Sequence, residues 1–409
     1  MTRRLVFAAI LLAQPALAAA QDRAAVERQF QAWLADDLWP AAEAAGVGRA
    51  TFERAFAGVA LDWSLPELQP PGVPVEEHPI EWQAEFRSPA AYFDENGLRI
   101  LARQGRERLA RWRETLDAIE ARYGVPAEIV VAIWGKETVF GDYKLPEPAI
   151  PTLATQAFMG RRSALFRQEL IAALKILDNG DITLERMRSS WAGGLGQPQF
   201  QPRLYLVYAV DFDGDGHRDI WDSVPDTLAS IANFLANEGW QRGLGWAFEV
   251  DLPPGVSCAL EGPDQARPLT EWTRLGVRRA GGQALPNDGG HDASLMMPAG
   301  RHGPAFIATD NFQVIKQYNR SDLYALYVGH LAHRFGDDRP FRAAWSSVGH
   351  LSRGDVRAIQ EMLTAAGHDT GGADGLVGYR TRVAIGRWQE ANGLLATCLP
   401  EEAMVSRIR

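Results

Sequence analysis

Residues 129–143 combine one acidic side chain with an apolar helical pattern, and such a carboxylate could serve as a general acid. Ile133, Trp134 and Phe140 place apolar surface on more than one side of the predicted helix near Glu137, so we expect a buried helix. Desolvation would raise the pKa of Glu137, and the negative end of the helix dipole would act in the same direction. A carboxylic acid that stays protonated near neutral pH can protonate a leaving group. The alternative at this point is an ordinary solvent-exposed Glu at a helix end.

A second stretch is rich in acidic side chains at the spacing of a calcium-binding loop. In an EF-hand loop the acids supply oxygens, a Gly makes the sharp turn and the residue at position 7 contributes its carbonyl. Position 12 is normally Glu, which is one methylene longer than Asp, so Asp226 is an alternative closing ligand to Asp222. A metal-free acidic turn is the other interpretation, but closely spaced acids repel one another unless a cation is present. We predict a structural Ca²⁺ ion and no organic cofactor. The residues at positions 1, 3, 5, 6, 7, 9 and 12 are Asp211, Asp213, Asp215, Gly216, His217, Asp219 and Asp222.

Residues 189–208 interrupt the helical pattern with glycines, prolines and glutamines. Between Trp191 and Pro202 there are three glycines and two prolines among large apolar residues. Because Gly lets a backbone pass close to another surface or a ligand, this segment could line a cleft. A simple turn between helices is the alternative, although such a turn has little need for three glutamines at 197, 199 and 201.

Several motifs occur in one order and together resemble the MltB-type family of lytic murein transglycosylases. The resemblance covers roughly residues 80–335. The last 65 residues resemble a peptidoglycan-binding domain of the short three-helix type, through a pattern of mostly Leu, Gly and Gln. The motifs of the catalytic family are Ile-Trp-Gly-Lys-Glu137-Thr-x-Phe-Gly, Arg161-Arg162, Ser190-x-Ala-Gly-Gly-Leu-Gly-x-x-Gln199-Phe-x-Pro, Tyr-Ala-Val-Asp211-Phe-Asp-Gly-Asp-Gly-His and Tyr318-Asn319.

This resemblance implies a mainly α, α+β fold with a lysozyme-like core, a helical N-terminal lobe, a small β insertion and a separate C-terminal domain. Hydrophobic periodicity predicts one long helix over about residues 95–121 and a return to helix over 312–335. The expected parts are a signal peptide at 1–21, a catalytic region at 22–340 and a peptidoglycan-binding domain at 345–409. Within the catalytic region we expect the lobe at 22–110, the core at 111–245 and 310–340, and the insertion at 246–309.

The resemblance also implies roles for individual residues around a cleft for alternating N-acetylglucosamine and N-acetylmuramic acid. Glu137 falls on the only catalytic acid/base of the family. The sequence departs from the family pattern at Gln201 and Arg203, and these two residues are expected to alter sugar contacts. The sugar subsites are expected to be lined by Arg161, Arg162, Ser190, Gln199, Tyr318, Asn319 and Tyr324. The metal loop is expected to use Asp211, Asp213, Asp215, the His217 carbonyl and Asp226.

The implied reaction cleaves the β-1,4 bond between N-acetylmuramic acid and N-acetylglucosamine and forms 1,6-anhydromuramic acid ends, with Glu137 acting alone. One alternative is a lysozyme-like hydrolase in which Asp142 or Glu147 is a second carboxylate. The other is a non-catalytic scaffold that binds the cell wall. On this interpretation, removal of residues 345–409 weakens binding to sacculi and leaves turnover of small glycans intact.

Composition and the N-terminus set the expected cellular context. A formal charge of −9 on 409 residues argues against nucleic acid or an anionic membrane as a partner. Arg3 and Arg4, followed by an apolar run and small residues, are typical of a secretory signal peptide. No Cys lies near the cleavage site for a lipid anchor, and no later run has the roughly 18 apolar residues of a spanning helix. We predict an exported, soluble periplasmic protein that binds peptidoglycan glycan strands. Export permits a Cys258–Cys398 disulfide, but the 140-residue spacing leaves their pairing open.

Overall fold

The computed structural model describes residues 14–72, 89–286, 290–346 and 351–408. Residues 1–13 of the expected signal peptide lie outside the described part of the chain. The chain divides into two compact units, one of residues 1–79 and 137–231 and the other of residues 80–136 and 232–409. Two helices, α7 (Ala127–Thr138) and α11 (Val224–Asn237), run across a boundary between these units.

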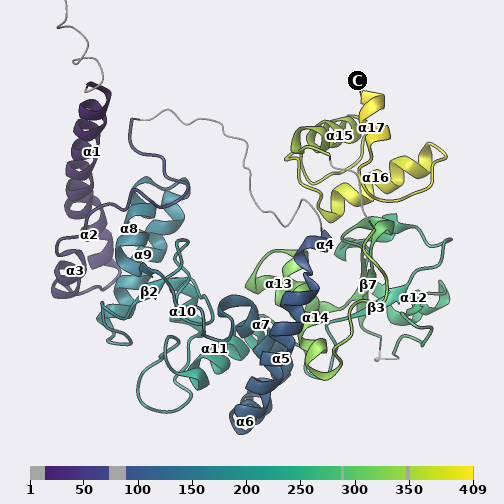
Figure 1. Ribbon diagram of the computed structural model, residues 1–409, viewed down its shortest axis with the longest axis horizontal. Coiled ribbons are helices and arrows are strands. Elements are labelled where there is room, and N and C mark those ends of the chain that lie inside the picture. Colours follow the sequence, from purple (N-terminus) through teal and green to yellow (C-terminus); the bar gives the residue numbers. More distant parts are fainter. Residues whose placement is uncertain (1–13, 73–88, 287–289, 347–350, 409) are drawn as a thin grey trace, which may run out of the picture. The chain divides into compact units, whose positions relative to one another are not determined.

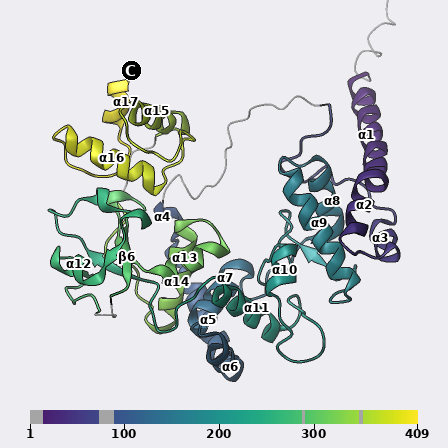
Figure 2. The same cartoon turned by 180° about the vertical axis from the view of Figure 1, so that it is seen from behind.

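The first unit is built around a hairpin of two helices, α8 and α9, which lie side by side (Figures 1 and 2). Most residues of α8 are buried, because its sequence is apolar on nearly every face. Helices α2 and α3 pack against this pair, and α10 packs against α9. The elements are α1 (Gln14–Trp33), a π-helical turn η1 (Leu34–Leu38), α2 (Trp39–Ala44), α3 (Arg49–Phe56), β1 (Glu147–Pro148), α8 (Ala149–Met159), α9 (Ser163–Asp178), β2 (Arg188–Ser189) and α10 (Pro202–Tyr208).

Strands β1 and β2 form a short antiparallel pair in which Glu147 lies opposite Ser189. Their pairing joins the segment after α7 to the start of the glycine-rich segment at 190–201. The two segments that carry the candidate chemistry of this unit are therefore held together by backbone hydrogen bonds.

The helical part of the second unit contains α4 (Pro89–Tyr92), α5 (Glu95–Arg111), α6 (Arg113–Tyr123), α13 (Asp310–Tyr318) and α14 (Asp322–Gly336). The prediction of one continuous helix over about 95–121 is wrong, because Trp112 leaves helical geometry at φ −107° and ψ 22°. The segment 312–335 also forms two helices. Ser321 starts the second by accepting the Tyr324 N–H at its side-chain oxygen, at 3.2 Å, as an N-cap residue does.

The strands of the second unit form one five-stranded antiparallel sheet in the order β4-β6-β7-β3-β5. Every one of these strands lies between residues 247 and 308, within the segment expected to be the β insertion. The short helix α12 (Leu269–Arg274) buries Trp272 against this part of the chain. The strands are β3 (Ala247–Asp251), β4 (Arg267–Pro268), β5 (Arg278–Arg279), β6 (Asp292–Met296) and β7 (Ala305–Ala308).

The C-terminal part contains three helices, which lie together in both views (Figures 1 and 2). They are α15 (Arg353–Ala365), α16 (Tyr379–Ala391) and α17 (Glu402–Ile408). Ser352 and Asp355 form a capping box at the start of α15, which explains where this helix begins. Ile359, Leu363, Ile385 and Met404 form the centre of a small hydrophobic core.

The predicted fold class is confirmed: the chain is mainly helical, with a small β insertion and a C-terminal helical domain that has a hydrophobic core of its own. Within the described ranges, no helix is both long enough and apolar enough to cross a lipid bilayer.

Candidate active site and metal loop

Glu137 lies one residue before the end of α7 and is half-buried. The preceding residues of the helix are almost fully enclosed, with Ile133 at 0% and Trp134 at 1% exposure. The expected buried helix is therefore found. It ends at the half-buried Glu137, which retains access to solvent at this position.

The backbone turns sharply just after Glu137. Val139 and Phe140 adopt left-handed conformations, with φ of 53° and 59°, and Gly141 follows at 77°. Left-handed backbone is uncommon outside glycine and is found most often where surrounding structure holds it in place for a functional reason. Thr138 supplies part of that support, since its hydroxyl donates to the Gln197 carbonyl at 2.8 Å and accepts the Gly141 N–H at 3.2 Å.

The glycine-rich segment 190–201 is a compact loop closed by its own hydrogen bonds. Leu195 and Phe200 exchange backbone hydrogen bonds at 2.7 and 3.1 Å. Gly196, at φ 61°, lies so close to the backbone of Ile220 that an added Cβ would be 2.6 Å from the Ile220 carbonyl oxygen. The Gln197 N–H donates to the same carbonyl at 2.9 Å. This segment is therefore an ordered loop that is hydrogen-bonded to the end of α7, rather than a simple turn between helices.

Two of the predicted sugar contacts, Ser190 and Gln199, belong to this loop and are half-buried. The Ser190 hydroxyl accepts the Gly194 N–H at 3.1 Å. The Gln199 amide nitrogen donates to the carbonyls of Gly194 and Gly196 at 3.3 and 2.9 Å. Gln199 also has a left-handed backbone, with φ of 55°. Both side chains thus shape the loop.

Arg161 and Arg162 are exposed at the end of α8. Their partner is Glu67, which no sequence pattern marked. Its carboxylate lies 3.6 Å from the Arg162 guanidinium, and its carbonyl accepts the Arg161 N–H at 3.0 Å. Glu67 has a left-handed backbone at φ 64°. Burial raises the pKa of Glu67, while Arg162 and Arg161 act in the opposite direction.

The two residues that depart from the family pattern have internal partners. The Gln201 amide donates to the Ala192 carbonyl at 3.2 Å. The Arg203 guanidinium and backbone N–H both bind the buried Glu169 carboxylate, at 2.7 and 2.9 Å. The structure accordingly gives both residues a role in holding the loop and the start of α10.

The remaining predicted sugar contacts lie in the second unit, around the junction of α13 and α14. Asn319 is exposed and Tyr318 is half-buried. Tyr324 is only 2% exposed and stacks behind Tyr318, with ring centroids 6.4 Å apart and planes 8° from parallel. Its placement is that of a support for Tyr318.

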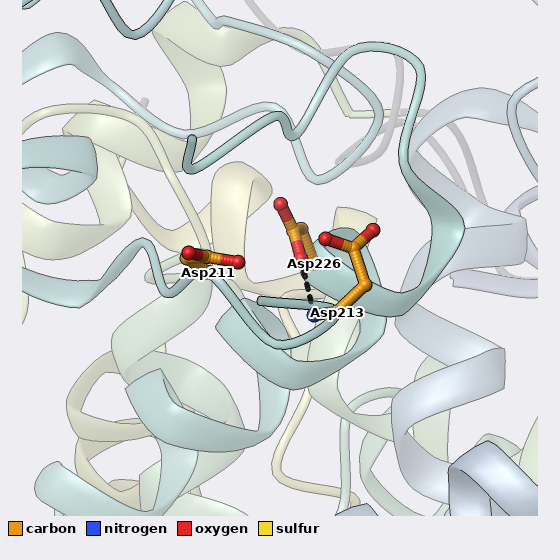
Figure 3. A group of neighbouring side chains, drawn as sticks. All are labelled: Asp211, Asp213 and Asp226. Carbon is orange, nitrogen blue, oxygen red and sulfur yellow. Dashed lines mark hydrogen bonds between the residues drawn. The ribbon is translucent and has the colours of Figure 1, made fainter. Parts of the chain in front are cut away.

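The acidic loop gathers three carboxylates, those of Asp211, Asp213 and Asp226, with one oxygen of each within 4.8 Å of the others. Figure 3 shows the Asp226 carboxylate between those of Asp211 and Asp213. Asp226 is fully buried, and its oxygens accept the N–H groups of Phe212 and Asp219, each at 2.8 Å. Burial raises the pKa of Asp226, and these backbone donors offset part of that rise.

The other predicted ligands are placed differently. Asp215 accepts the His217 N–H at 2.8 Å, and Asp222 forms an ion pair with Arg186, so neither side chain joins the group of three. The EF-hand pattern did not reveal that Arg186 is the partner of Asp222, and it is Asp226 whose carboxylate lies with those of Asp211 and Asp213.

The donor set fits a hard divalent cation. All three grouped side chains offer carboxylate oxygens, which Ca²⁺ prefers. Among the described residues, no Lys or Arg nitrogen lies within 4.0 Å of the carboxylates of Asp211, Asp213 or Asp226. Gly214 and Gly216, at φ 79° and 92°, donate their N–H groups to Asp211 at 2.7 and 2.9 Å, so the loop is already wrapped around its first acid.

With this geometry in place, comparison with known proteins decides the family. The model of the transglycosylase SLT domain family matches residues 29–333, which is most of the chain. The chain belongs to the SLT transglycosylase family. A separate match to a peptidoglycan binding domain covers residues 352–404, over the three C-terminal helices.

Two solved structures are similar to this chain over different lengths. SltB3 of Pseudomonas aeruginosa, solved in complex with NAG-anhNAM-pentapeptide, is 41% identical, with 93% of this chain and 99% of that chain covered and a TM-score of 0.80. The lytic transglycosylase SLT35 of Escherichia coli, solved in complex with calcium, is 29% identical over 58% of this chain and 75% of that chain, with a TM-score of 0.51.

A curated relative is the membrane-bound lytic murein transglycosylase B of Escherichia coli (strain K12), which is 33% identical over 227 residues. The match covers 54% of this chain and 60% of the length of that relative.

Proposed function

We propose that this protein is a lytic murein transglycosylase that cleaves the β-1,4 bond between N-acetylmuramic acid and N-acetylglucosamine in peptidoglycan. The observation that carries the proposal is the position of Glu137, at the end of a buried helix and just before a left-handed turn, in a chain of the SLT transglycosylase family. The similarity to SltB3, which was solved with an anhydro-muropeptide, supports the same substrate class.

In the proposed reaction Glu137 acts first as an acid. It gives its proton to the glycosidic oxygen as the bond from that oxygen to C1 of the muramic acid breaks, so the N-acetylglucosamine leaves as a neutral alcohol. The acetamido group of the muramic acid can stabilise the positive charge that develops at C1. This step needs a carboxylic acid that carries its proton, and Glu137 is the residue that we assign to supply it.

Glu137 then acts as a base. As a carboxylate it removes the proton from the C6 hydroxyl of the same sugar, and the C6 oxygen bonds to C1 to close the 1,6-anhydro ring. Intramolecular attack has a large advantage in effective concentration over attack by water. The proton count balances with Glu137 alone, because the proton given in the first step is regained in the second. No second carboxylate is required.

We assign the sugar contacts to two groups of residues. Ser190, Gln199, Arg161 and Arg162 belong to the first, with the arginines suited to the carboxylates of muramic acid or its peptide. Tyr318 and Asn319 belong to the second, and Tyr324 supports Tyr318 from behind through their parallel rings.

We assign Ca²⁺ to the loop of Asp211, Asp213 and Asp226, with further oxygens from Asp215 and the His217 carbonyl. When bound, the ion supplies positive charge that compensates the carboxylates gathered there. The calcium complex of the relative SLT35 supports the choice of metal. We assign the ion a structural role. The acids that would bind it lie in the segment between α10 and α11, and the Gln197 N–H of the glycine-rich loop donates to the Ile220 carbonyl of the same segment.

We also propose that the protein is exported to the periplasm through residues 1–21 and that residues 345–409 bind peptidoglycan. The three-helix match at 352–404 supports the second assignment.

The proposed function is tested by Glu137→Gln in the full-length protein, with purified sacculi as substrate. We expect the release of muropeptides to be lost while the variant still sediments with sacculi, because only the proton donor has been removed. Asp142→Asn and Glu147→Gln are the matched controls, since these carboxylates would be essential in a two-carboxylate hydrolase. Muropeptide release at the wild-type rate by Glu137→Gln, or its loss in either control, would overturn the assignment of Glu137 as sole acid and base.

A further inference from the structure

We propose that the C-terminal domain is a fixed structural part of the catalytic region and that its Arg382 positions the segment carrying Tyr318 and Asn319. This inference rests on the proposed function, since it concerns the residues assigned to sugar binding. It differs from the expectation drawn from sequence, in which residues 345–409 form a separable module that only retains the enzyme on the wall.

The first support is covalent. Cys258 in the β insertion and Cys398 in the C-terminal domain form a disulfide across 140 residues, and both are fully buried. The same domain therefore cannot move freely on a tether. Ala396 and Cys398 also belong to the hydrophobic core of the insertion, together with Trp272 and Ile307.

The surfaces of the insertion and of α16 are matched to each other. An added Cβ at Gly262 would lie 2.5 Å from the Tyr379 ring, so only Gly allows this approach. The Tyr379 hydroxyl donates to the Asp264 carboxylate at 2.7 Å. The Arg301 N–H donates to the Thr397 carbonyl at 2.9 Å. A cavity at this junction holds only about 20 Å³, roughly the space of one water molecule. The contact is close-packed.

The centre of this contact is a buried ion pair. Arg382 of α16 and Glu261 of the insertion are 4% and 1% exposed, and two guanidinium nitrogens bind the two carboxylate oxygens at 2.6 and 2.9 Å. Glu261 also accepts the Met297 N–H at 2.9 Å, and Arg382 donates to the Val377 carbonyl at 3.0 Å. Because a buried ion pair adds little net stability over apolar residues of similar size, its value lies in fixing one geometry.

Arg382 reaches a third part of the chain, the start of α14. Its guanidinium lies 3.9 Å from the carboxylate of Asp322, and the other oxygen of Asp322 binds the Lys316 ammonium of α13 at 2.7 Å. Lys316 and Asp322 bracket the turn that contains Tyr318 and Asn319. The Arg382 guanidinium of the C-terminal domain therefore lies beside the Lys316–Asp322 ion pair that joins the two ends of this turn. We infer that Arg382 holds the turn in its sugar-binding geometry.

The test is steady-state kinetics of the full-length protein on a small soluble glycan of two N-acetylglucosamine–N-acetylmuramic acid repeats, which is too short to need retention on the wall. Arg382→Met should lower the melting temperature and raise KM, because it leaves Glu261 buried without its partner. The decisive variant is Glu261→Met with Arg382→Met, which replaces the pair by apolar side chains and leaves the disulfide in place.

This double variant separates positioning from stability. We expect its melting temperature to return close to the wild-type value while KM stays raised by about tenfold or more, since the charge facing Asp322 is gone. A wild-type KM together with a recovered melting temperature would show that Arg382 is only structural and would overturn the proposal. Arg387→Met, at an exposed position of the same helix, is the matched control and should match the wild type in both measurements.

Asp322→Asn is a second test of the proposal, to be used if the double variant does not fold. It leaves the buried pair intact and removes only the charge that links Arg382 and Lys316 to the turn. A raised KM is expected, and a wild-type KM would overturn the proposal. Failure of the proposed function is distinguishable from all of these outcomes, because in that case the wild-type protein itself releases no 1,6-anhydro product from the glycan.

Discussion

Loss of the disulfide between Cys258 and Cys398 should loosen the second unit without unfolding it. In the chain-entropy description, a cross-link that closes a 140-residue loop stabilises the folded state by up to about 5 kcal/mol, and removal of native disulfides typically costs about 2–5 kcal/mol. The shared hydrophobic core and the Glu261–Arg382 pair remain in the double variant Cys258→Ala, Cys398→Ala, so we expect a folded protein with a weakened contact.

Hydrogen–deuterium exchange with peptide mass spectrometry is the appropriate assay, because a chain of two compact units need not unfold in a single step. Peptides from 255–300 and 380–400 should exchange roughly 30-fold to several thousand-fold faster in the double variant where exchange reports the opening of this contact. Peptides from α8 and α9 are the internal control and should be unchanged. The wild-type protein treated with a reductant should match the double variant.

Two results would refute this reasoning about the disulfide. One is equal exchange of the 255–300 and 380–400 peptides in the wild type and the double variant. The other is alkylation of two free thiols in wild-type protein purified without a reductant.

Three other perturbations test separate parts of the structure. Chelation of calcium should lower the melting temperature. If the free calcium concentration was a hundred times the Kd of the site, the loss of unfolding free energy is about 2.7 kcal/mol. Asp226→Asn should lower the melting temperature in the same way with calcium present, and an unchanged melting temperature on chelation counts against the metal loop. Burial lowers the pKa of His330 from 6.5 to about 3, so the unfolded chain binds a proton at higher pH than the folded chain does. The free energy of unfolding should therefore fall as the pH drops below about 6.5, by about 2 kcal/mol at pH 5. His330→Phe should reduce this dependence of unfolding free energy on pH, and an unchanged dependence would contradict the assignment to His330. Gly196→Ala should reduce both the melting temperature and muropeptide release, because the added Cβ would clash with the Ile220 carbonyl oxygen. Gly180 has a similar left-handed φ of 79° but open space around it, so Gly180→Ala measures the cost of the left-handed backbone alone. Equal losses of melting temperature in the two variants would show that the clash at Gly196 has no effect.

The parts of the fold that the sequence predicts are those set by local patterns. The helix that carries Glu137 was predictable because its apolar residues follow one another closely in the sequence. The acidic loop was predictable because EF-hand ligands follow one another at fixed spacing. The insertion at 246–309 was expected from the family resemblance, and all five strands of the sheet lie within it.

What was missed depends on contacts between distant residues or on backbone conformation. The left-handed turn at Val139 and Phe140 has no signature in residue type, since neither is Gly or Asn. The pairing of Arg186 with Asp222, over 36 residues, removed an acid that the loop pattern had included. The Glu261–Arg382 pair spans 121 residues, and nothing in either local sequence marks the two as partners. The break at Trp112 shows the same limit within a helix, because periodicity continued across it.

We propose that Glu137 alone catalyses an intramolecular reaction that consumes no water. Mass spectrometry of the products released from purified sacculi by the wild-type protein tests this proposal. We expect muropeptides that end in 1,6-anhydromuramic acid, each one water lighter than the hydrolysis product. Release of reducing-end muropeptides of the full hydrolytic mass would contradict it and would make the protein a hydrolase.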